Sequence, residues 1–99
     1  MTHRFVKMNG LGNDFIVVEA RKNPFQPDET TVRALASRQG GIGCDQLIAL
    51  EPSSRANVFM RIWNADGTQA GACGNATRCV GQILLNETGS HEVSIETLA

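Results

Sequence analysis

The sequence predicts a single domain of the α/β class, with one mixed sheet and two helices. Short runs rich in β-branched and aromatic residues, such as residues 14–19 and 58–63, are typical of strands. Between and after these runs, apolar residues recur at the spacing of one helical face, over residues 32–36 and 76–84. The length of 99 residues fits one small domain, which buries about two-thirds of the surface that its unfolded chain exposes.

Five segments are predicted to be strands, because β-branched and aromatic residues gather in them or alternate with polar residues. Turn-forming segments separate them: the glycine-rich residues 9–13 divide the first two, and residues 51–54 divide the third and fourth. The predicted strands cover residues 4–8, 14–19, 46–50, 58–63 and 91–97.

A first helix is predicted after the proline-containing loop at residues 23–27. Either Asp28 or Thr30 can cap its N-terminus, and glycines 40 and 41 are expected to end it. Its inward-facing side chains are predicted to be Val32, Leu35 and Ala36.

A second helix is predicted from Asn75 to about Asn86, with Gly89 ending it and Cys73 just before its start. Its apolar face comprises Ala76, Cys79, Val80, Ile83 and Leu84. The free N–H groups and the positive dipole at a helix start favour a thiolate, and the N–H groups of Gly74 and Asn75 can hold a carboxylate or phosphate. The alternative, that Cys73 is an ordinary small residue in a turn, stays open at this point.

Composition excludes several classes of function. A net charge of −1, few aromatic residues and no basic stripe argue against nucleic-acid binding. No apolar run reaches membrane-spanning length, and the N-terminus lacks the apolar core of a signal peptide. Three cysteines, an odd number without secretory context, indicate a reducing compartment and no disulfide framework. The predicted location is the cytoplasm.

The sequence predicts neither a dinucleotide-binding site nor a zinc site. Residues 10–12 resemble a dinucleotide-binding loop, but the third glycine is missing and a strand follows where a helix is required. Cys44, Cys73 and Cys79 form no CxxC pair and have no nearby histidine, so no zinc site is predicted. Cys44 and Cys79 are interpreted as core residues. We expect neither a metal nor a cofactor.

Three amide side chains stand where a predicted strand meets a turn: Asn13, Gln46 and Asn64. Each of them alone is most simply explained as satisfying backbone groups of a loop. Together with the cysteine segment, however, they belong to a larger pattern. It comprises KMNGLGNDF at residues 7–15, GIGCDQ at 41–46, MRIWNADG at 60–67 and CGNATRC at 73–79.

These four segments resemble, in order and spacing, the motifs of diaminopimelate epimerases. The resemblance covers the N-terminal half of that family, whose second half contains another Cys-Gly motif. Residues 1–99 are therefore expected to be an N-terminal half, with the C-terminal half absent. The implied fold has two similar α/β halves, each a mixed sheet wrapped around a central helix, with the active site between them.

The resemblance also implies an activity. Diaminopimelate epimerases are isomerases that interconvert L,L- and meso-diaminopimelate for lysine and peptidoglycan synthesis, without pyridoxal phosphate. One cysteine removes the α-proton as a thiolate, and a second cysteine delivers a proton as a thiol to the opposite face. Cys73 matches one of the two. The substrate contacts that the resemblance implies are Asn13, Gln46, Asn64, Gly74 and Asn75.

Other readings stay open from the sequence. A proline-racemase-like or phenazine-pathway isomerase would share the fold, and a non-catalytic carboxylate-binding or assembly module belongs to a different class. The chain ends on a strand-like pattern, which would leave an open sheet edge. We therefore expect a homodimer or a larger species, held by edge-strand pairing or by an exchanged segment near residues 91–97.

Overall fold

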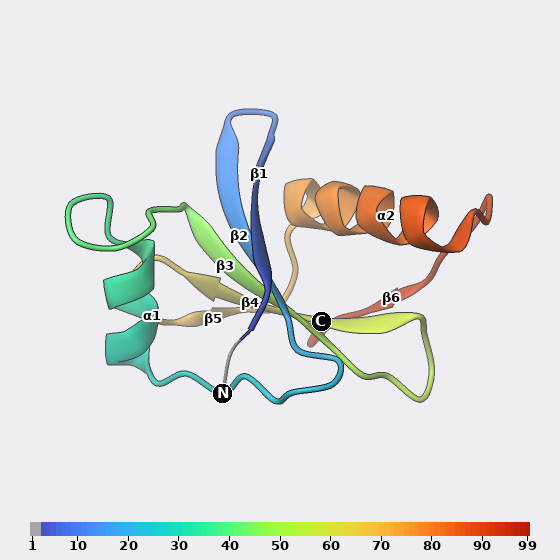
Figure 1. Ribbon diagram of the computed structural model, residues 1–99, viewed down its shortest axis with the longest axis horizontal. Helices are drawn as coiled ribbons and strands as arrows, with labels where there is room; N and C mark the ends of the chain where they lie inside the picture. Colours follow the sequence, from blue (N-terminus) through green and yellow to red (C-terminus); the bar gives the residue numbers. More distant parts are fainter. Residues whose placement is uncertain (1–2) are drawn as a thin grey trace.

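The computed structural model describes residues 3–99, which form one six-stranded mixed sheet and two helices (Figure 1). This confirms the predicted fold class. The elements are β1 (Phe5–Gly10), β2 (Asn13–Glu19), α1 (Glu29–Ala36), β3 (Gln46–Glu51), β4 (Val58–Asn64), β5 (Gln69–Ala70), α2 (Gly74–Thr88) and β6 (Ile95–Glu96). Among these described residues, neither helix is long and apolar enough to cross a membrane.

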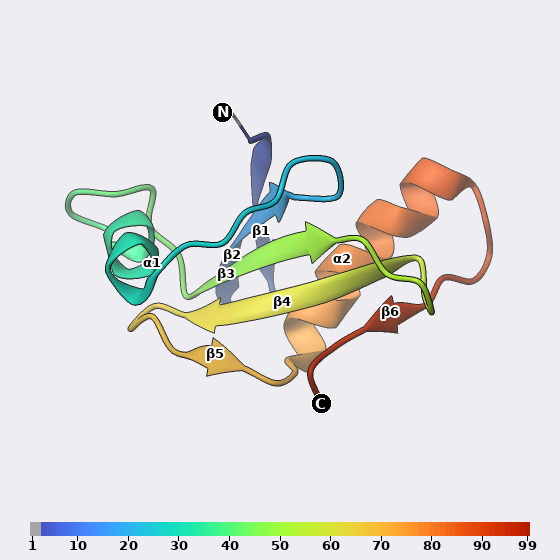
Figure 2. The same cartoon turned by 90° about the horizontal axis from the view of Figure 1, so that it is seen from below.

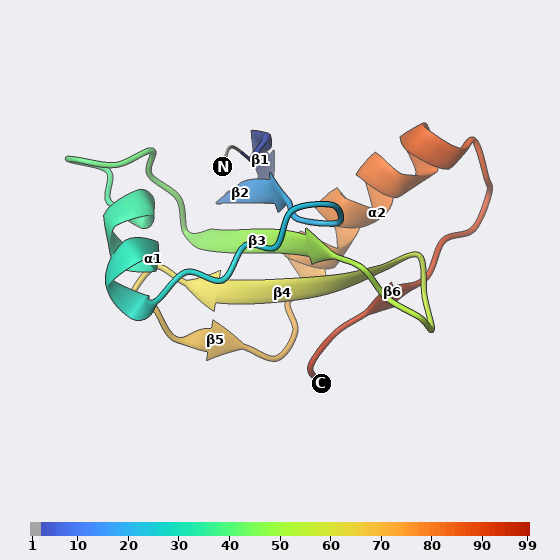
Figure 3. The same cartoon turned by 60° about the horizontal axis from the view of Figure 1, so that its bottom comes forward.

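The strand order places four chain segments at one end of the sheet. β1 pairs antiparallel with β2, β2 parallel with β3, and β3 antiparallel with β4. The end of β1, the starts of β2 and β3, and the end of β4 therefore lie together. β5 and β6 both pair with β4 along its outer edge, at opposite ends of that strand (Figures 2 and 3).

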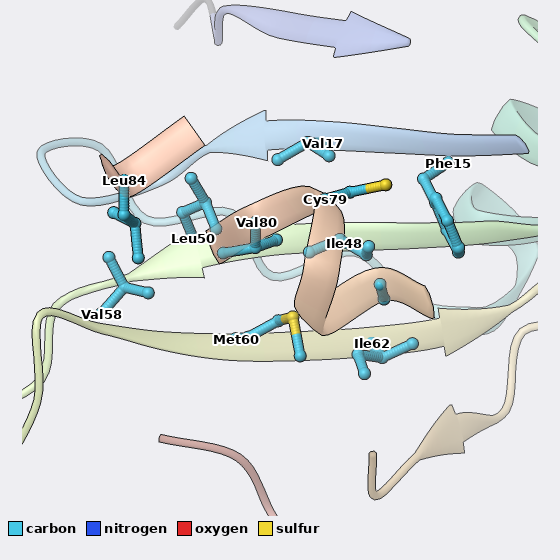
Figure 4. Close-up of a cluster of buried hydrophobic side chains, with 11 residues drawn as sticks. Phe15, Val17, Ile48, Leu50, Val58, Met60, Ile62, Cys79, Val80 and Leu84 are labelled. Carbon is cyan, nitrogen blue, oxygen red and sulfur yellow. The ribbon is translucent and has the colours of Figure 1, made fainter. Parts of the chain in front are cut away.

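The two helices cover opposite faces of the sheet, so strand side chains alternate between two cores. Figure 2 shows α2 behind β3 and β4. Its core is drawn in Figure 4 and contains Phe15, Val17, Ile48, Leu50, Val58, Met60, Ile62, Ala76, Cys79, Val80 and Leu84. The α1 core contains Ile16, Val18, Ala20, Val32, Ala36, Cys44, Leu47, Ala49 and Trp63. The buried positions of Cys44 and Cys79 confirm that both are core residues.

Helix α1 begins as predicted but ends earlier than predicted. Asp28 Oδ1 accepts a hydrogen bond from Thr31 N over 2.8 Å and caps the helix. The helix ends at Ala36, before glycines 40 and 41, because the returning chain bonds its last carbonyls: Gly43 N donates to Leu35 O over 3.0 Å. The C-cap is Ser37, and glycines 40 and 41 lie beyond it in the loop, so they do not end the helix.

Helix α2 spans the predicted segment and continues to Thr88. Gly89 ends it in the left-handed conformation, with φ of 68°, and donates its N–H to Leu85 O over 2.9 Å. Glycine adopts that conformation without steric cost, which explains why the helix stops here.

The long strand predicted for residues 91–97 is wrong, because only Ile95 and Glu96 pair as a strand. Just before them, Ser94 N donates to the side-chain Oδ1 of Asn57 over 2.8 Å, so an amide side chain replaces a backbone partner. β5 was not predicted and occupies the other part of the same β4 edge.

Candidate active site

The topology brings the three predicted amide side chains to the same end and face of the sheet. Asn13 opens β2, Gln46 opens β3 and Asn64 closes β4. Each lies two positions from a residue of the α2 core, and side chains two apart on a strand share a face. Those neighbours in the core are Phe15, Ile48 and Ile62.

Gln46 and Asn64 are joined directly. They are register partners in the β3–β4 pair, and Gln46 Nε2 donates to Asn64 Oδ1 over 3.1 Å. Asn64 Nδ2 in turn donates to Thr68 Oγ1 over 3.2 Å, and Asn64 N donates to Thr68 O over 2.7 Å. Asp66 Oδ1 accepts from Thr68 N over 2.9 Å. This closed turn holds the Asn64 amide in one place.

Cys73 stands at the N-cap of α2 in an extended conformation, with φ of −153° and ψ of 120°. Its carbonyl oxygen accepts from both the N–H and the hydroxyl of Thr77, each over 2.9 Å. No side chain of residues 3–99 caps this helix start. The first N–H groups of α2, those of Gly74 and Asn75, are thus left for another acceptor.

Gly10 allows the first turns of α2 to approach the end of β1. A Cβ atom on Gly10 would lie 2.8 Å from Cys79 Sγ and 3.7 Å from Asn75 O. Gly10 is also the register partner of Asn13 across the β1–β2 turn. The N-terminus of α2 therefore lies at the same end of the sheet as Asn13, beside the hairpin that Figure 1 shows rising next to it.

The three cysteines are all free thiols, but their surroundings differ. Cys44 and Cys79 are only 3% and 7% exposed, and burial raises the pKa of each thiol. A negative charge on Cys73 further raises the pKa of Cys79. Cys73 is half-buried at the helix start. It is the one thiol of the three that a small molecule can reach.

Sequence reasoning missed one charged network beside these residues. Arg38 bonds both Asp14 and Asp45, and Asp14 also accepts from Asn9. The hydrogen bond from Asn9 and then that from Arg38 hold the pKa of Asp14 below its usual range. Both aspartates directly adjoin a predicted site residue in the sequence, which was the available signal. Nothing in the sequence pointed to Arg38.

Among residues 3–99, no cluster of three or more His, Cys, Asp or Glu side chains is suited to hold a metal ion. A groove of about 990 Å³ lies at the opposite end of the sheet, by the last turns of α2, where Arg21 forms an ion pair with Glu87 over 2.9 Å. None of the predicted site residues lines this groove.

Comparison with known sequences gives consistent matches. The family model described as diaminopimelate epimerase matches residues 5–99. A diaminopimelate epimerase of Phenylobacterium zucineum is 58% identical over 99 residues, which are 100% of this chain and 36% of the relative. One of Rhodospirillum centenum is 50% identical, over 98% of this chain and 34% of the relative. The chain thus spans about a third of the length of the curated relatives that it matches.

Among solved structures, two proteins of the phenazine biosynthesis PhzF family share the fold. The protein of Enterococcus faecalis aligns with a TM-score of 0.65 at 16% identity, over 93% of this chain and 35% of that one. The protein of Bacillus anthracis aligns with a TM-score of 0.56 at 24% identity, over 96% and 31%. The fold is therefore common to both groups, and the match of residues 5–99 shows that this chain belongs to the diaminopimelate epimerase family.

Proposed function

We propose that this chain supplies one half of the active site of a cofactor-independent epimerase that interconverts L,L- and meso-diaminopimelate. One observation carries the proposal: an accessible thiol, Cys73, stands at an uncapped helix start at the sheet end where the three site amides gather. The family match supports the same substrate. The reaction belongs to lysine biosynthesis, which suits the cytoplasmic location expected from the free cysteines.

The chemistry requires a base and an acid on opposite faces of the α-carbon. The Cys73 thiolate takes the α-proton from one face, or its thiol gives a proton to that face in the reverse direction. A second thiol, contributed by the part of the enzyme that corresponds to the family's other half, acts on the opposite face. The proton removed and the proton delivered balance, so the product differs only in configuration.

The start of α2 has two roles in this proposal. As the α-proton leaves, negative charge grows on the substrate carboxylate. The N–H groups of Gly74 and Asn75, at the positive end of the helix dipole, would donate hydrogen bonds to that carboxylate and stabilise its charge. The same helix end carries Cys73 at its N-cap, so the reacting thiol and the proposed carboxylate-binding N–H groups are adjacent in the chain. The N-terminus of α2 is therefore proposed to serve both carboxylate binding and proton transfer.

The amides of Asn13, Gln46 and Asn64 are proposed to contact the polar groups of the substrate. Gln46 donates one N–H to Asn64. Its carbonyl oxygen Oε1 therefore remains as an acceptor that suits an ammonium group. Because the Asn64 turn is closed by its own hydrogen bonds, these contacts are arranged before the substrate binds.

A chimera tests this proposal. Residues 1–99 replace the matching segment of the Phenylobacterium zucineum relative, which is aligned over the whole of this chain. We expect the chimera to convert L,L- to meso-diaminopimelate and the 99-residue chain alone to be inactive, since one thiol serves one face only. A folded chimera without epimerase activity would refute the proposal.

The alternatives named from the sequence are tested by the same chimera. A phenazine-type or proline-racemase-like isomerase would turn over its own substrate class and leave diaminopimelate unchanged. A non-catalytic module would bind diaminopimelate with no turnover. The fold match to the phenazine proteins is below 25% identity and therefore carries the fold alone.

We also propose that the protein is a homodimer. The β1 edge has no further strand beside it among residues 3–99, and it exposes Phe5 and Val6 by 52% and 48%. Such an edge is a template for pairing with another chain. The association expected through residues 91–97 is less favoured, because Ile95 and Glu96 already pair with β4.

A further inference from the structure

We propose that Arg38 is a positioning residue for this site and acts, through Asp14 and Asp45, on the turn that carries Asn13. The inference deepens the proposed function and rests on it, because it concerns the placing of a proposed substrate contact. Arg38 itself lies beyond the end of α1 and is not proposed to touch the substrate.

The contacts form a closed network. Arg38 Nη1 donates to Asp14 Oδ2 over 3.0 Å, and Arg38 Nη2 donates to Asp45 Oδ1 over 3.2 Å. Asp45 Oδ2 accepts from Asp14 N over 2.7 Å, and Asp14 Oδ1 accepts from Asn9 Nδ2 over 2.7 Å. Asp45 N also donates to Asp14 O over 2.9 Å. Every oxygen of the two carboxylates is therefore engaged.

The network joins the two chain segments that deliver site residues. Asp14 directly follows Asn13 at the start of β2, and Asp45 directly precedes Gln46 at the start of β3. Asn9 and Asp14 are register partners across the β1–β2 turn. Arg38 therefore fixes the Asn13 turn relative to the start of β3, and so relative to Gln46.

The β1–β2 turn has an unfavourable backbone conformation, so contacts that restrain its ends help to hold it. Leu11 and Gly12 both have positive φ, of 54° and 89°, and a leucine rarely adopts this backbone conformation. Leu11 is 73% exposed, so burial of its side chain does little to offset that strain. The hydrogen bonds from Asn9 and Arg38 to Asp14 lie just outside this turn and restrain both of its strands.

The stem of Arg38 is itself held in place. A Cβ atom on Gly43 would lie 3.2 Å from Arg38 Cγ and 3.3 Å from its Cα, so the loop backbone packs closely on the arginine. The guanidinium group, by contrast, belongs to a side chain that is 52% exposed, and that of Asp45 is 45% exposed. Exposed ion pairs add little to global stability. The effect of Arg38 is therefore expected in the site geometry rather than in the unfolding equilibrium.

Steady-state kinetics of the chimera test the inference. For Arg38→Gln we expect KM for diaminopimelate to rise about tenfold, with a smaller change in kcat and Tm within about 2 °C of the parent. Arg38→Lys keeps the charge but loses the planar fork, so it should restore KM only in part. Arg55→Gln is the matched control: Arg55 pairs with Glu96 over 3.8 Å at the other end of the sheet, and its KM should not change.

A double-mutant cycle with Asn13→Ala separates positioning from general damage. If Arg38 acts through Asn13, Arg38→Gln should raise KM much less in the Asn13→Ala background than in the parent. Additive effects, or a lowered Tm and Vmax with unchanged KM, would overturn the positioning role and leave the proposed function intact. If Asn13→Ala alone leaves KM unchanged, the proposed substrate contact is wrong, and the positioning role is overturned with it.

Discussion

Gly10 and Cys79 leave no room for a methyl group between the end of β1 and the second turn of α2. A Cβ atom on Gly10 would lie 2.8 Å from Cys79 Sγ, closer than such atoms approach in folded proteins. Cys79 is only 7% exposed and points toward Phe15 in Figure 4. This contact sets how closely the helix start that carries Cys73 approaches the sheet.

Replacing Gly10 should therefore destabilise the fold. We expect Gly10→Ala to lower the free energy of unfolding by about 1–3 kcal/mol, the usual cost of overpacking, and Cys79→Ala to restore part of the loss. The measurement is urea unfolding of the 99-residue chain. Gly81→Ala is the control, because nothing lies within 4 Å of its added Cβ in α2, and alanine there should stabilise by about 0.5–1 kcal/mol. A Gly10→Ala variant as stable as the parent would contradict the contact.

Cys73 should be the first thiol to react with iodoacetamide. Cys44 and Cys79 are buried, so the reagent reaches them poorly. Burial also raises the pKa of both thiols, so a smaller fraction of each is present as the reactive thiolate. We expect Cys73 to be alkylated at least about tenfold faster than either, as followed by peptide mass spectrometry. Preferential labelling of Cys79 would remove the basis for assigning Cys73.

Acid should weaken α1 through its cap. The backbone hydrogen bond from Thr31, and then that from its side chain, hold the pKa of Asp28 below its ordinary value of 3.8. A lowered folded-state pKa contributes stability that is present above the unfolded value and lost as the pH falls through the folded value. Stability should therefore fall below about pH 4.

Asp28→Asn separates the cap from its charge. Asparagine caps helices about as well as aspartate, so we expect near-parental stability at pH 7 and a smaller loss between pH 4 and pH 2 in urea unfolding. Asp28→Ala should be less stable at pH 7 as well. An identical acid response of the parent and Asp28→Asn would show that Asp28 does not carry this dependence.

The homodimer can be tested at two edges separately. Sedimentation equilibrium of the 99-residue chain should give about twice the mass of one chain at micromolar concentration. Val6→Lys, on the exposed part of β1, should shift the protein to monomer, whereas Leu98→Lys, beyond β6, should not. If only Leu98→Lys disrupts the dimer, the pairing edge is the C-terminal one. A monomer at all concentrations would contradict the association.

The sequence predicted the central strands because burial leaves a local signal. β2 and β3 each carry four consecutive buried residues, which form continuous apolar runs in the sequence. β5 comprises only Gln69 and Ala70, too short for any pattern, and it exists because β4 offers it an edge. Residues 91–97 alternate like a strand, but only Ile95 and Glu96 pair with β4, and Ser94 N bonds the side chain of Asn57 instead of a backbone carbonyl.

The candidate site residues remain a prediction, and only part of their surroundings could be anticipated from the sequence. Asn13, Gln46 and Asn64 could be named only through the resemblance of their segments to the family motifs, since each alone is explained by its place at a turn; the strand order then brings them to one end of the sheet. The role of Arg38 could not be named, because its contacts join residues that are far apart in the sequence. Such a network is visible only when α1 and the β1–β2 turn are placed in space.

The most direct test of the central claim is the Cys73→Ser variant of the chimera, incubated with L,L-diaminopimelate in deuterated water. NMR at the α-carbon follows both epimer conversion and deuterium uptake. We predict that both fall about a thousandfold or more, while Tm and substrate binding change little, because serine keeps the shape but not the acidity of the thiol. Epimerisation by Cys73→Ser at the parental rate would contradict the assignment of Cys73 as an acid/base residue.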